Sequence, residues 1–501
     1  MAASLNARTY PIHVARSSLA SAATNTKSAS TNNPVATIFI LRSASARSTS
    51  LISRTSAETI RWVASKLVPQ RYYLETLGCP KNDVDSDKLE GTLLTAGMRA
   101  TDDPADADLV VVNTCAFIEE ARQESIDTIL ALDELRSATS RLVVTGCMAE
   151  RYGSELAEAL PEVDQVAGFG QAVAAVTGRK SIPVHSVPLP EMDLLNLPRP
   201  KSAVPWAYVK VAEGCDRSCG FCAIPSFRGP QRSRDVDSIL DEVEQLDVQE
   251  IVLVAQDLAS YGKDRPSELG AGSIVPLVRA VADRVPRVRL LYLYPSDLND
   301  ELIDTICGGD VPYFDLSLQH VSKPLLRRMR RPGDRDRFLD KIDAIRWRRP
   351  DAAFRSNFIV GYPGETEKDH DQLLDFVERA RVDWCGFFAY SPEEGTYAVG
   401  LDGVVPVSLM AERVAELREL QDGITAAARD GLIGTTQRVL VDESGVGRSH
   451  REAPEIDGIV NVESVLTVGE FHDVDIVDAL GPDLVAAGAR RTEDEPEPMC
   501  P

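Results

Sequence analysis

The chain has 501 residues, of which 44% are hydrophobic and 26% are charged, a composition typical of ordinary globular proteins. Its length is too great for one hydrophobic core, so about two to four domains are expected. No apolar run approaches the roughly 18 residues that a membrane helix needs, which argues against a membrane protein. The formal net charge is −23. A body this acidic should repel phosphate backbones, so a basic protein is a better candidate partner than nucleic acid.

The first 70 residues differ in charge from the rest of the chain. They contain eight Lys or Arg residues and one acid, Glu58, and they are rich in Ser and Ala. Three interpretations remain open: a disordered extension, an organellar transit peptide, or sequence upstream of the true start codon. We predict that the fold begins near Arg71. We also predict a cytoplasmic protein, unless residues 1–70 direct import into an organelle.

Three cysteines follow three predicted strands directly. The strands cover residues 72–77, 109–113 and 142–145, with helices predicted at 85–96 and 125–135, and they lead into Cys79, Cys115 and Cys147. This alternation of apolar strands and helices predicts a parallel sheet. Because the carboxyl ends of such strands form the ligand crevice, the three thiols should converge there. Three thiolates suit a [4Fe–4S] cluster with one open iron, or less well a catalytic zinc.

A second group, Cys215, Cys219 and Cys222, lies on one short loop after a strand predicted at 207–211. A zinc site normally uses cysteine pairs or adds histidine, and no fourth ligand stands nearby in the sequence. Gaps of three and two residues allow one loop to hold three corners of a cubane. The fourth iron would then be free to bind the amino and carboxylate groups of S-adenosylmethionine (SAM), with Phe221 beside the adenine.

This loop resembles the one that marks the radical SAM superfamily, whose fold is a partial (β/α)6 barrel. Strands predicted at 250–255, 289–293, 313–318, 356–360 and 384–390 agree with such a barrel, and its ligands bind in loops after the strands. The resemblance implies that SAM is contacted by side chains or backbone from these loops. The candidates, besides Phe221, are Gln256, Asp257, Gln319, Gly361 and Glu365.

A three-cysteine α/β domain followed by this barrel is similar to the methylthiotransferases, which modify either a tRNA adenosine or an aspartate of the small-subunit ribosomal protein numbered twelve. Segments 78–82, 222–225, 254–257, 318–320, 329–332 and 390–396 resemble the ribosomal-protein branch. The tRNA branch tends to carry Gln-Ser-Gly where this chain has Gln319-His320-Val321. The resemblance implies two [4Fe–4S] clusters, one generating a radical from SAM and one presenting sulfur. It also implies a reductant such as flavodoxin or ferredoxin.

The C-terminal part, with a helix predicted at 408–430 and strands at 437–441, 458–462 and 473–478, resembles a TRAM module, a small β-barrel. Residues 435–486 hold three basic residues and eleven acids, a net charge of −8. RNA binding requires the opposite sign, so this module favours a basic ribosomal protein over tRNA. The predicted organisation is a leader (1–70), an α/β domain (71–185), the barrel (201–431), the TRAM-like module (432–487) and an acidic tail (488–501).

The remaining candidates favour structural roles. His320 is interpreted as a hydrogen-bonded structural residue. The arginines between 327 and 337 are interpreted as a solvated helix face, with contact to the substrate as the alternative. Cys307, Cys385 and Cys500 are interpreted as packing or tail thiols. Two alternative functions remain: a tRNA adenosine methylthiotransferase, and a non-catalytic iron–sulfur carrier. A carrier would need neither a SAM pocket nor a whole barrel.

Overall fold

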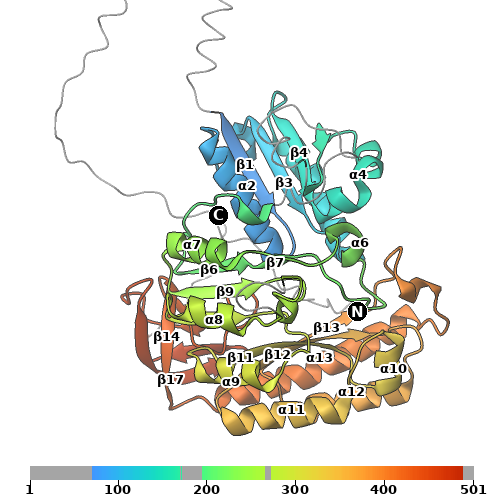
Figure 1. Ribbon diagram of the computed structural model, residues 1–501, viewed down its shortest axis with the longest axis vertical. Coiled ribbons are helices and arrows are strands. Elements are labelled where there is room, and N and C mark those ends of the chain that lie inside the picture. The colour runs from blue at the N-terminus through green and yellow to red at the C-terminus, as the bar shows by residue number, and fades with distance from the viewer. Residues whose placement is uncertain (1–69, 170, 172–193, 266–271, 489–501) are drawn as a thin grey trace, which may run out of the picture.

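The computed structural model describes residues 70–169, 171, 194–265 and 272–488. The predicted leader up to residue 69, the acidic tail from residue 489 and Cys500 lie outside the described residues. Figure 1 shows an α/β unit at one end of the long axis, with a partial barrel and a small β-barrel at the other end. Within the described ranges, no helix is both long and apolar enough to cross a membrane.

The N-terminal unit is a five-stranded parallel sheet in the order β2-β1-β3-β4-β5, as predicted for this α/β unit. Its strands are β1 (Arg71–Thr76), β2 (Arg99–Ala100), β3 (Leu109–Thr114), β4 (Arg141–Gly146) and β5 (Gln165–Val166). Its helices are α2 (Pro80–Thr95), α3 (Glu119–Leu135), α4 (Cys147–Ala159) and the 3-10 turn η3 (Pro104–Asp106). Every residue of β3 is buried, because α2 covers one face of the sheet while α3 and α4 cover the other.

Two helices begin earlier than the sequence pattern predicts. Helix α2 begins at Pro80 rather than 85, because Cys79 is extended at the N-cap and the fixed φ of proline suits the first helical position. Helix α3 begins at Glu119 rather than 125, where two glutamates favour the positive end of the helix dipole. Cys79 therefore occupies the N-cap position of α2. Cys147 is the first residue of α4.

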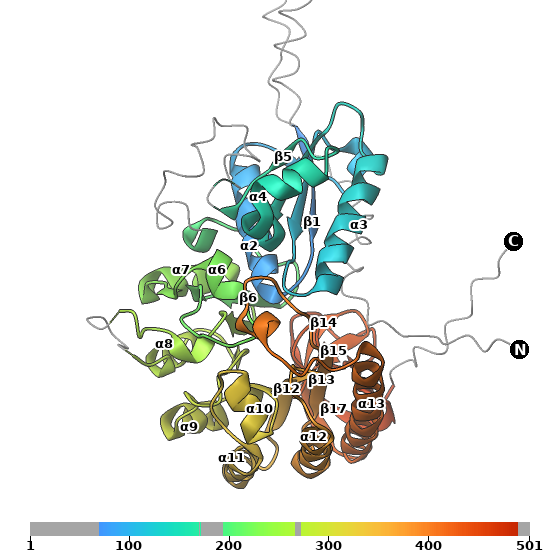
Figure 2. The same cartoon turned by 90° about the vertical axis from the view of Figure 1, so that its right-hand side faces the viewer.

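The central unit is an open barrel of six parallel strands with helices outside (Figure 2). The strands are β6 (Trp206–Lys210), β9 (Glu250–Val254), β10 (Arg287–Leu290), β11 (Tyr313–Gln319), β12 (Ala353–Val360) and β13 (Trp384–Ala389). The larger helices are α7 (Val236–Leu246), α8 (Val275–Ala282), α9 (Asp300–Gly308), α10 (Lys323–Arg328), α11 (Arg335–Arg348), α12 (Glu367–Ala380) and α13 (Val407–Asp430). The shorter elements are η5 (Leu194–Asn196), β7 (Ala212–Glu213), α6 (Ile224–Arg228), β8 (Arg232–Ser233), η6 (Leu258–Ser260) and η7 (Tyr397–Gly400).

The six strands form two sheets of three, β10-β9-β6 and β11-β12-β13. One isolated bridge between Leu293 and Leu316 connects them. The partial (β/α)6 barrel predicted from the sequence is therefore confirmed, with a narrow seam in its middle.

The two faces of the barrel sheet contact different parts of the chain. Along β6, Ala207 and Val209 point outward to the core beneath the helices, whereas Trp206 and Tyr208 point to the inner face. The inner face is covered by Val84 of α2 and by Ala453 of the C-terminal module. Both flanking units thus pack into the open side of the barrel.

The C-terminal unit is a closed barrel in the order β14-β15-β16-β18-β17. Its strands are β14 (Thr436–Glu443), β15 (Val446–Arg448), β16 (Val460–Asn461), β17 (Phe471–Leu480) and β18 (Asp483–Ala486). The sequence pattern predicted three of these and missed β15 and β18, which are too short to show a clear alternation.

Candidate iron–sulfur and SAM site

The first three cysteines lie at the carboxyl edge of three neighbouring strands, as predicted. In the parallel register Thr76 lies opposite Asn113, and Thr114 lies opposite Gly146. Gly78 has a φ of +108°, and a Cβ at this position would lie 2.9 Å from the Cβ of Cys115. Only glycine therefore allows the first loop to approach the second so closely. The fold brings Cys79, Cys115 and Cys147 to one edge.

Asn82, in the first turn of α2, connects the ends of the strands that precede the three cysteines. Its Nδ2 donates to the carbonyl oxygens of Leu77 at 2.8 Å and Thr114 at 3.1 Å. Its Oδ1 lies 3.6 Å from the Sγ of Cys147. One buried amide thus contacts the loop after β1, the last residue of β3 and the thiol after β4.

Burial holds the thiols of Cys115 and Cys147 in their protonated form. Burial raises the pKa of Cys115 to about 12, with a further contribution from the neighbouring Cys79 and Cys147. Burial also raises the pKa of Cys147, against the opposing effect of Arg228. Thiolate ligation of iron must therefore displace protons from these groups.

The second triad lies on the loop that follows β7. Gly214 has a φ of +79°, and a Cβ there would collide with the carbonyl oxygen of Pro230. The N–H of Cys215 donates to the carbonyl oxygen of Gly229 at 3.1 Å, and the N–H of Arg217 lies 3.4 Å from the Sγ of Cys215. The loop is therefore folded back on itself. Burial raises the pKa of Cys215 to about 11 and that of Cys222 to about 12.

Both thiol sets fit a cluster by their donor chemistry, since the first set places three sulfurs at one edge of a sheet and the second places three on one short loop. In the part of the chain that the structure describes, no three His, Cys, Asp or Glu side chains gather closely enough to hold one metal ion. The irons of a cubane stand at separate corners, so its thiolates need not converge on one point. The assignment of the six cysteines as cluster ligands stays a prediction.

The prediction of a solvated helix face is wrong for Arg331. This side chain is buried, and its Nη1 donates to the Sγ of Cys219 at 3.2 Å. Its guanidinium also lies 4.2 Å from the ring centre of Tyr294 and donates to the carbonyl oxygen of Ser317. The preceding Arg330 takes a left-handed φ of +57°, and this turn directs the chain back toward the cysteine loop.

Two predicted SAM residues, Gln256 and Asp257, follow β9 beside the second triad. Asp257 is buried and accepts hydrogen bonds from Arg217 Nε at 2.6 Å and Ser260 Oγ at 2.7 Å. Gln256 Nε2 donates to Glu213 Oε1 at 2.6 Å. Asp257 Oδ1 and Gln256 Oε1 are buried and accept no hydrogen bond. Both residues thus retain an acceptor that an amino group of SAM could use.

The other predicted SAM residues stand at further strand ends of the barrel. Gln319 closes β11 with a φ of +70°, and Gly361 follows β12 with a φ of +82°. Glu365 accepts a hydrogen bond from the N–H of Gly361 and pairs with Arg413 of α13 at 3.0 Å, so it shapes its own loop. Phe221 packs against the barrel core. The structure places these residues at the predicted end of the barrel, and their contact with SAM stays a prediction.

His320, Cys307 and Cys385 make the packing and hydrogen-bond contacts expected of structural residues. His320 is buried and its Nδ1 accepts a hydrogen bond from the N–H of Ser322 at 3.0 Å. Burial lowers the pKa of His320 to about 3, so the ring is neutral near pH 7. Cys307 and Cys385 are partly buried and pack against the barrel core.

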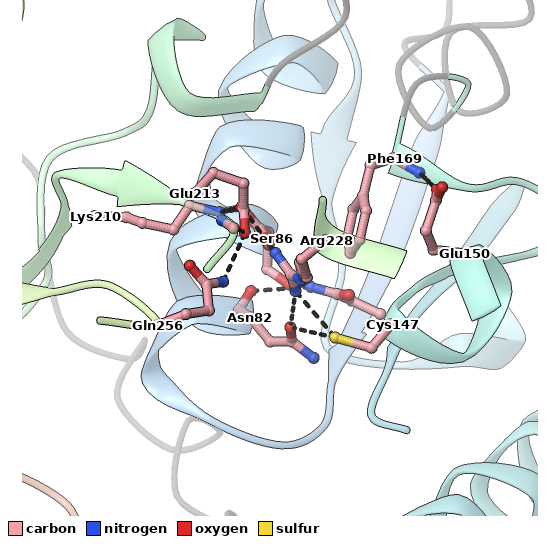
Figure 3. A network of polar contacts seen from close by, with 12 residues as sticks. Asn82, Ser86, Cys147, Glu150, Phe169, Lys210, Glu213, Arg228 and Gln256 are labelled. Atoms are coloured by element: carbon pink, nitrogen blue, oxygen red, sulfur yellow. Dashed lines mark hydrogen bonds and ion pairs between the residues drawn. The ribbon is translucent and has the colours of Figure 1, made fainter. Parts of the chain in front are cut away.

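Arg228, the last residue of α6, was missed by the sequence analysis. Its Nη2 donates to Cys147 Sγ at 3.0 Å and to Asn82 Oδ1 at 2.9 Å, although α6 belongs to the barrel (Figure 3). Its Nη1 pairs with Asp85 at 3.0 Å and with Glu213 at 2.9 Å. Arg228 therefore crosses from the loop of the second triad to the first triad. No local sequence signal marks it, since its partners come from other parts of the chain.

A second contact between the two units is formed by Glu393, in the loop after β13. Its buried carboxylate pairs with Arg122 of α3 and, at 2.7 Å, with Arg151 of α4. Ser391 Oγ also donates to Glu393, at 2.6 Å. The segment 390–396, part of the family resemblance above, thus attaches the barrel to the N-terminal unit.

Comparison with known proteins supports the resemblance drawn from the cysteine loops. The uncharacterised protein family UPF0004 matches residues 71–168, the radical SAM superfamily residues 209–377 and the TRAM domain residues 433–488. The chain is 42% identical over 473 residues to the ribosomal protein uS12 methylthiotransferase RimO of Cutibacterium acnes, covering 83% of this chain and 98% of that protein. It is 43% identical over 431 residues to the protein of that name from Moorella thermoacetica, covering 81% and 98%.

Among solved structures, the chain is similar to the radical SAM methyltransferase TsrM from Kitasatospora setae. The TM-score is 0.47 at 16% sequence identity, covering 65% of this chain and 77% of that one.

Proposed function

The chain belongs to the RimO family of ribosomal protein uS12 methylthiotransferases, and from that membership we propose that it adds a methylthio group to the β-carbon of an aspartate in uS12. It does so with two [4Fe–4S] clusters and SAM. Cys215, Cys219 and Cys222 hold the cluster that acts with SAM. Cys79, Cys115 and Cys147 hold the cluster that carries sulfur.

The observation that carries this proposal is the closeness of the two triads across the junction between units. Helix α6 has five residues; its first, Ile224, stands two positions after Cys222, and its last, Arg228, contacts Cys147. When bound, the cofactors supply a radical that can take hydrogen from a carbon too weakly acidic for any general base, and a sulfur atom to join it. The chain's own residues hold the two sites side by side and bury the surfaces between them.

The residues around the second triad orient SAM. Asp257 Oδ1 and Gln256 Oε1 are buried acceptors that would bind the amino group of SAM. The guanidinium groups of Arg217 and Arg331 lie 3.9 and 4.2 Å from the ring centre of Tyr294. Electrons come from a small reductant such as flavodoxin or ferredoxin.

The C-terminal barrel receives the basic substrate. Part of its acidity is used internally, since Glu452 pairs with Arg429 at 2.5 Å, and Asp457 pairs with Arg355 at 2.5 Å. Asp473 and Asp475 on β17 are exposed to solvent. These outward carboxylates favour a basic ribosomal protein by charge complementarity and disfavour tRNA.

The test uses the full chain with both clusters reconstituted under anaerobic conditions, together with SAM and a reductant. Mass spectrometry of uS12 should reveal a methylthio group on one aspartate. A parallel reaction with tRNA should leave adenosine unmodified. Modified adenosine with unmodified uS12 would contradict the substrate assignment, and the absence of released 5′-deoxyadenosine would favour a non-catalytic carrier.

A further inference from the structure

We propose that Arg228, which belongs to the barrel, is a positioning residue for the N-terminal cluster. Its hydrogen bond to Cys147 raises the reduction potential of that cluster. The inference rests on the proposed function, because it takes Cys79, Cys115 and Cys147 as the ligands of that cluster. It adds a specific role for a residue outside both triads.

The guanidinium group of Arg228 is held by hydrogen bonds and by an aromatic ring. Nη2 donates to Cys147 Sγ at 3.0 Å and to Asn82 Oδ1 at 2.9 Å, while the ring of Phe169 lies over it at 4.0 Å (Figure 3). Phe169 is itself anchored, because its N–H donates to Glu150 Oε2 at 2.7 Å. The side chain of Arg228 is only 3% exposed. Because Arg228 is enclosed in this way, water does not compete for its hydrogen bond to Cys147 Sγ.

The charges around Arg228 balance. Lys210 and Arg228 face Asp85 and Glu213, two positive groups against two negative ones, and all four are buried. Of these four side chains, Arg228 is the one that reaches a cysteine sulfur. Hydrogen bonds to cluster sulfurs and nearby positive charge stabilise the reduced, more negative cluster, which raises its potential.

The barrel supplies a matched arrangement at the second triad. Arg331 donates to Cys219 Sγ at 3.2 Å, as Arg228 donates to Cys147. Each triad therefore has one guanidinium on one of its sulfurs, and both arginines belong to the barrel. This pairing gives the experiment a control in which the same substitution is made at the other cluster.

The experiment isolates one cluster at a time in the full chain. Replacing Cys215, Cys219 and Cys222 with Ala leaves the N-terminal cluster, whose potential is measured by redox titration followed by electron paramagnetic resonance. In this background Arg228→Gln should move the potential to a more negative value. A tenfold change in the redox equilibrium corresponds to about 59 mV for a one-electron couple. Arg228→Lys keeps the charge but loses the fork-shaped donor, so its shift should be smaller.

The control is Arg331→Gln in the chain whose Cys79, Cys115 and Cys147 are Ala, where the barrel cluster should shift instead. Arg331→Gln in the first background should leave the N-terminal potential unchanged. Iron content and thermal unfolding are measured for each variant. If Arg228→Gln binds no iron, Arg228→Lys is measured in its place. A more negative potential then supports the inference, and an unchanged potential contradicts it. An unchanged potential at full iron content overturns the inference. Equal shifts of the N-terminal potential by Arg228→Gln and Arg331→Gln in the first background also overturn it. A parent lacking iron although Arg228 is intact would instead contradict the proposed function.

Discussion

Glu250, the first residue of β9, and Arg448, the last residue of β15, form a buried ion pair at 3.1 Å that joins the radical SAM barrel to the C-terminal barrel. The same carboxylate accepts a hydrogen bond from Arg289 Nε at 2.7 Å. Burial alone would raise the pKa of Glu250, but the nearby Arg289 and Arg448 lower it to about 2. At the start of β9, this buried ion pair thus attaches the radical SAM barrel to the C-terminal module.

We predict that Glu250→Gln strongly destabilises the protein, because it removes the carboxylate that pairs with the buried guanidinium of Arg289 and one of the two carboxylates that pair with Arg448. Breaking a buried pair in this way costs roughly 3–5 kcal/mol. The pKa of Glu250 is about 2 in the folded chain, below its ordinary 4.5. Its contribution is therefore fully present above about pH 4.5 and is lost as the pH falls toward 2. The variant's stability should accordingly depend less on pH across that interval, as measured by chemical unfolding.

The matched control is Glu244→Gln. Glu244 pairs with Arg284 at 2.8 Å on the surface, where both side chains are substantially exposed. Such a pair contributes at most about 1 kcal/mol. Equal losses in the unfolding free energy of the two variants would contradict the role assigned to Glu250.

The sequence predicted the placement of the first three cysteines at strand ends because its signals are local. Each of Cys79, Cys115 and Cys147 comes just after a predicted strand, so the position of the thiol follows from the strand. Arg228 and Arg331 give no such signal. Their roles depend on contacts with Cys147 and Cys219 that only the tertiary packing creates.

The division of the barrel into two three-stranded sheets could not be predicted from the sequence either. Residues around Leu293 and Leu316 have the apolar pattern of strands, yet they form one isolated bridge between the two sheets. The same holds for part of the C-terminal acidity. The pattern counts Glu452 and Asp457 as surface charge, whereas Arg429 and Arg355 pair with them inside the molecule.

Reconstituted protein should contain about eight irons per chain, since each cysteine triad fits one [4Fe–4S] cluster. Replacement of the barrel cysteines, Cys215, Cys219 and Cys222, with Ala should halve the iron content and abolish SAM cleavage. Iron analysis and measurement of 5′-deoxyadenosine check both outcomes. Stoichiometric zinc without iron would exclude the cluster assignment.

The N-terminal triad should be required for sulfur transfer alone. A chain with Cys79, Cys115 and Cys147 changed to Ala keeps the barrel loop intact, so we expect it to cleave SAM reductively at a rate within a few-fold of wild type. Mass spectrometry should find no methylthio group on uS12. If uS12 were modified as well as by the wild type, the N-terminal thiols would have a structural role only.

The outward acids of β17 should guide the substrate. Attraction between these carboxylates and a basic ribosomal protein is screened by salt over a Debye length of about 8 Å at physiological ionic strength, so the affinity for uS12 should fall as salt rises. Changing Asp473, Asp475 and Asp478 to Lys should weaken the complex and flatten its salt dependence. SAM cleavage should stay intact, because this strand lies in a module separate from both cysteine triads.

A matched variant distinguishes local recognition from net charge. The acids Asp340, Asp371 and Glu378 are exposed on α11 and α12, the outer helices of the barrel, and changing them to Lys alters the net charge by the same amount. If β17 forms the recognition surface, titration of labelled uS12 should show a clear loss of affinity for the β17 variant and a small one for the α11–α12 variant. Equal losses would mean that only the overall charge matters. Iron content must match the wild type in both, because a loss of clusters would indicate misfolding rather than weakened recognition.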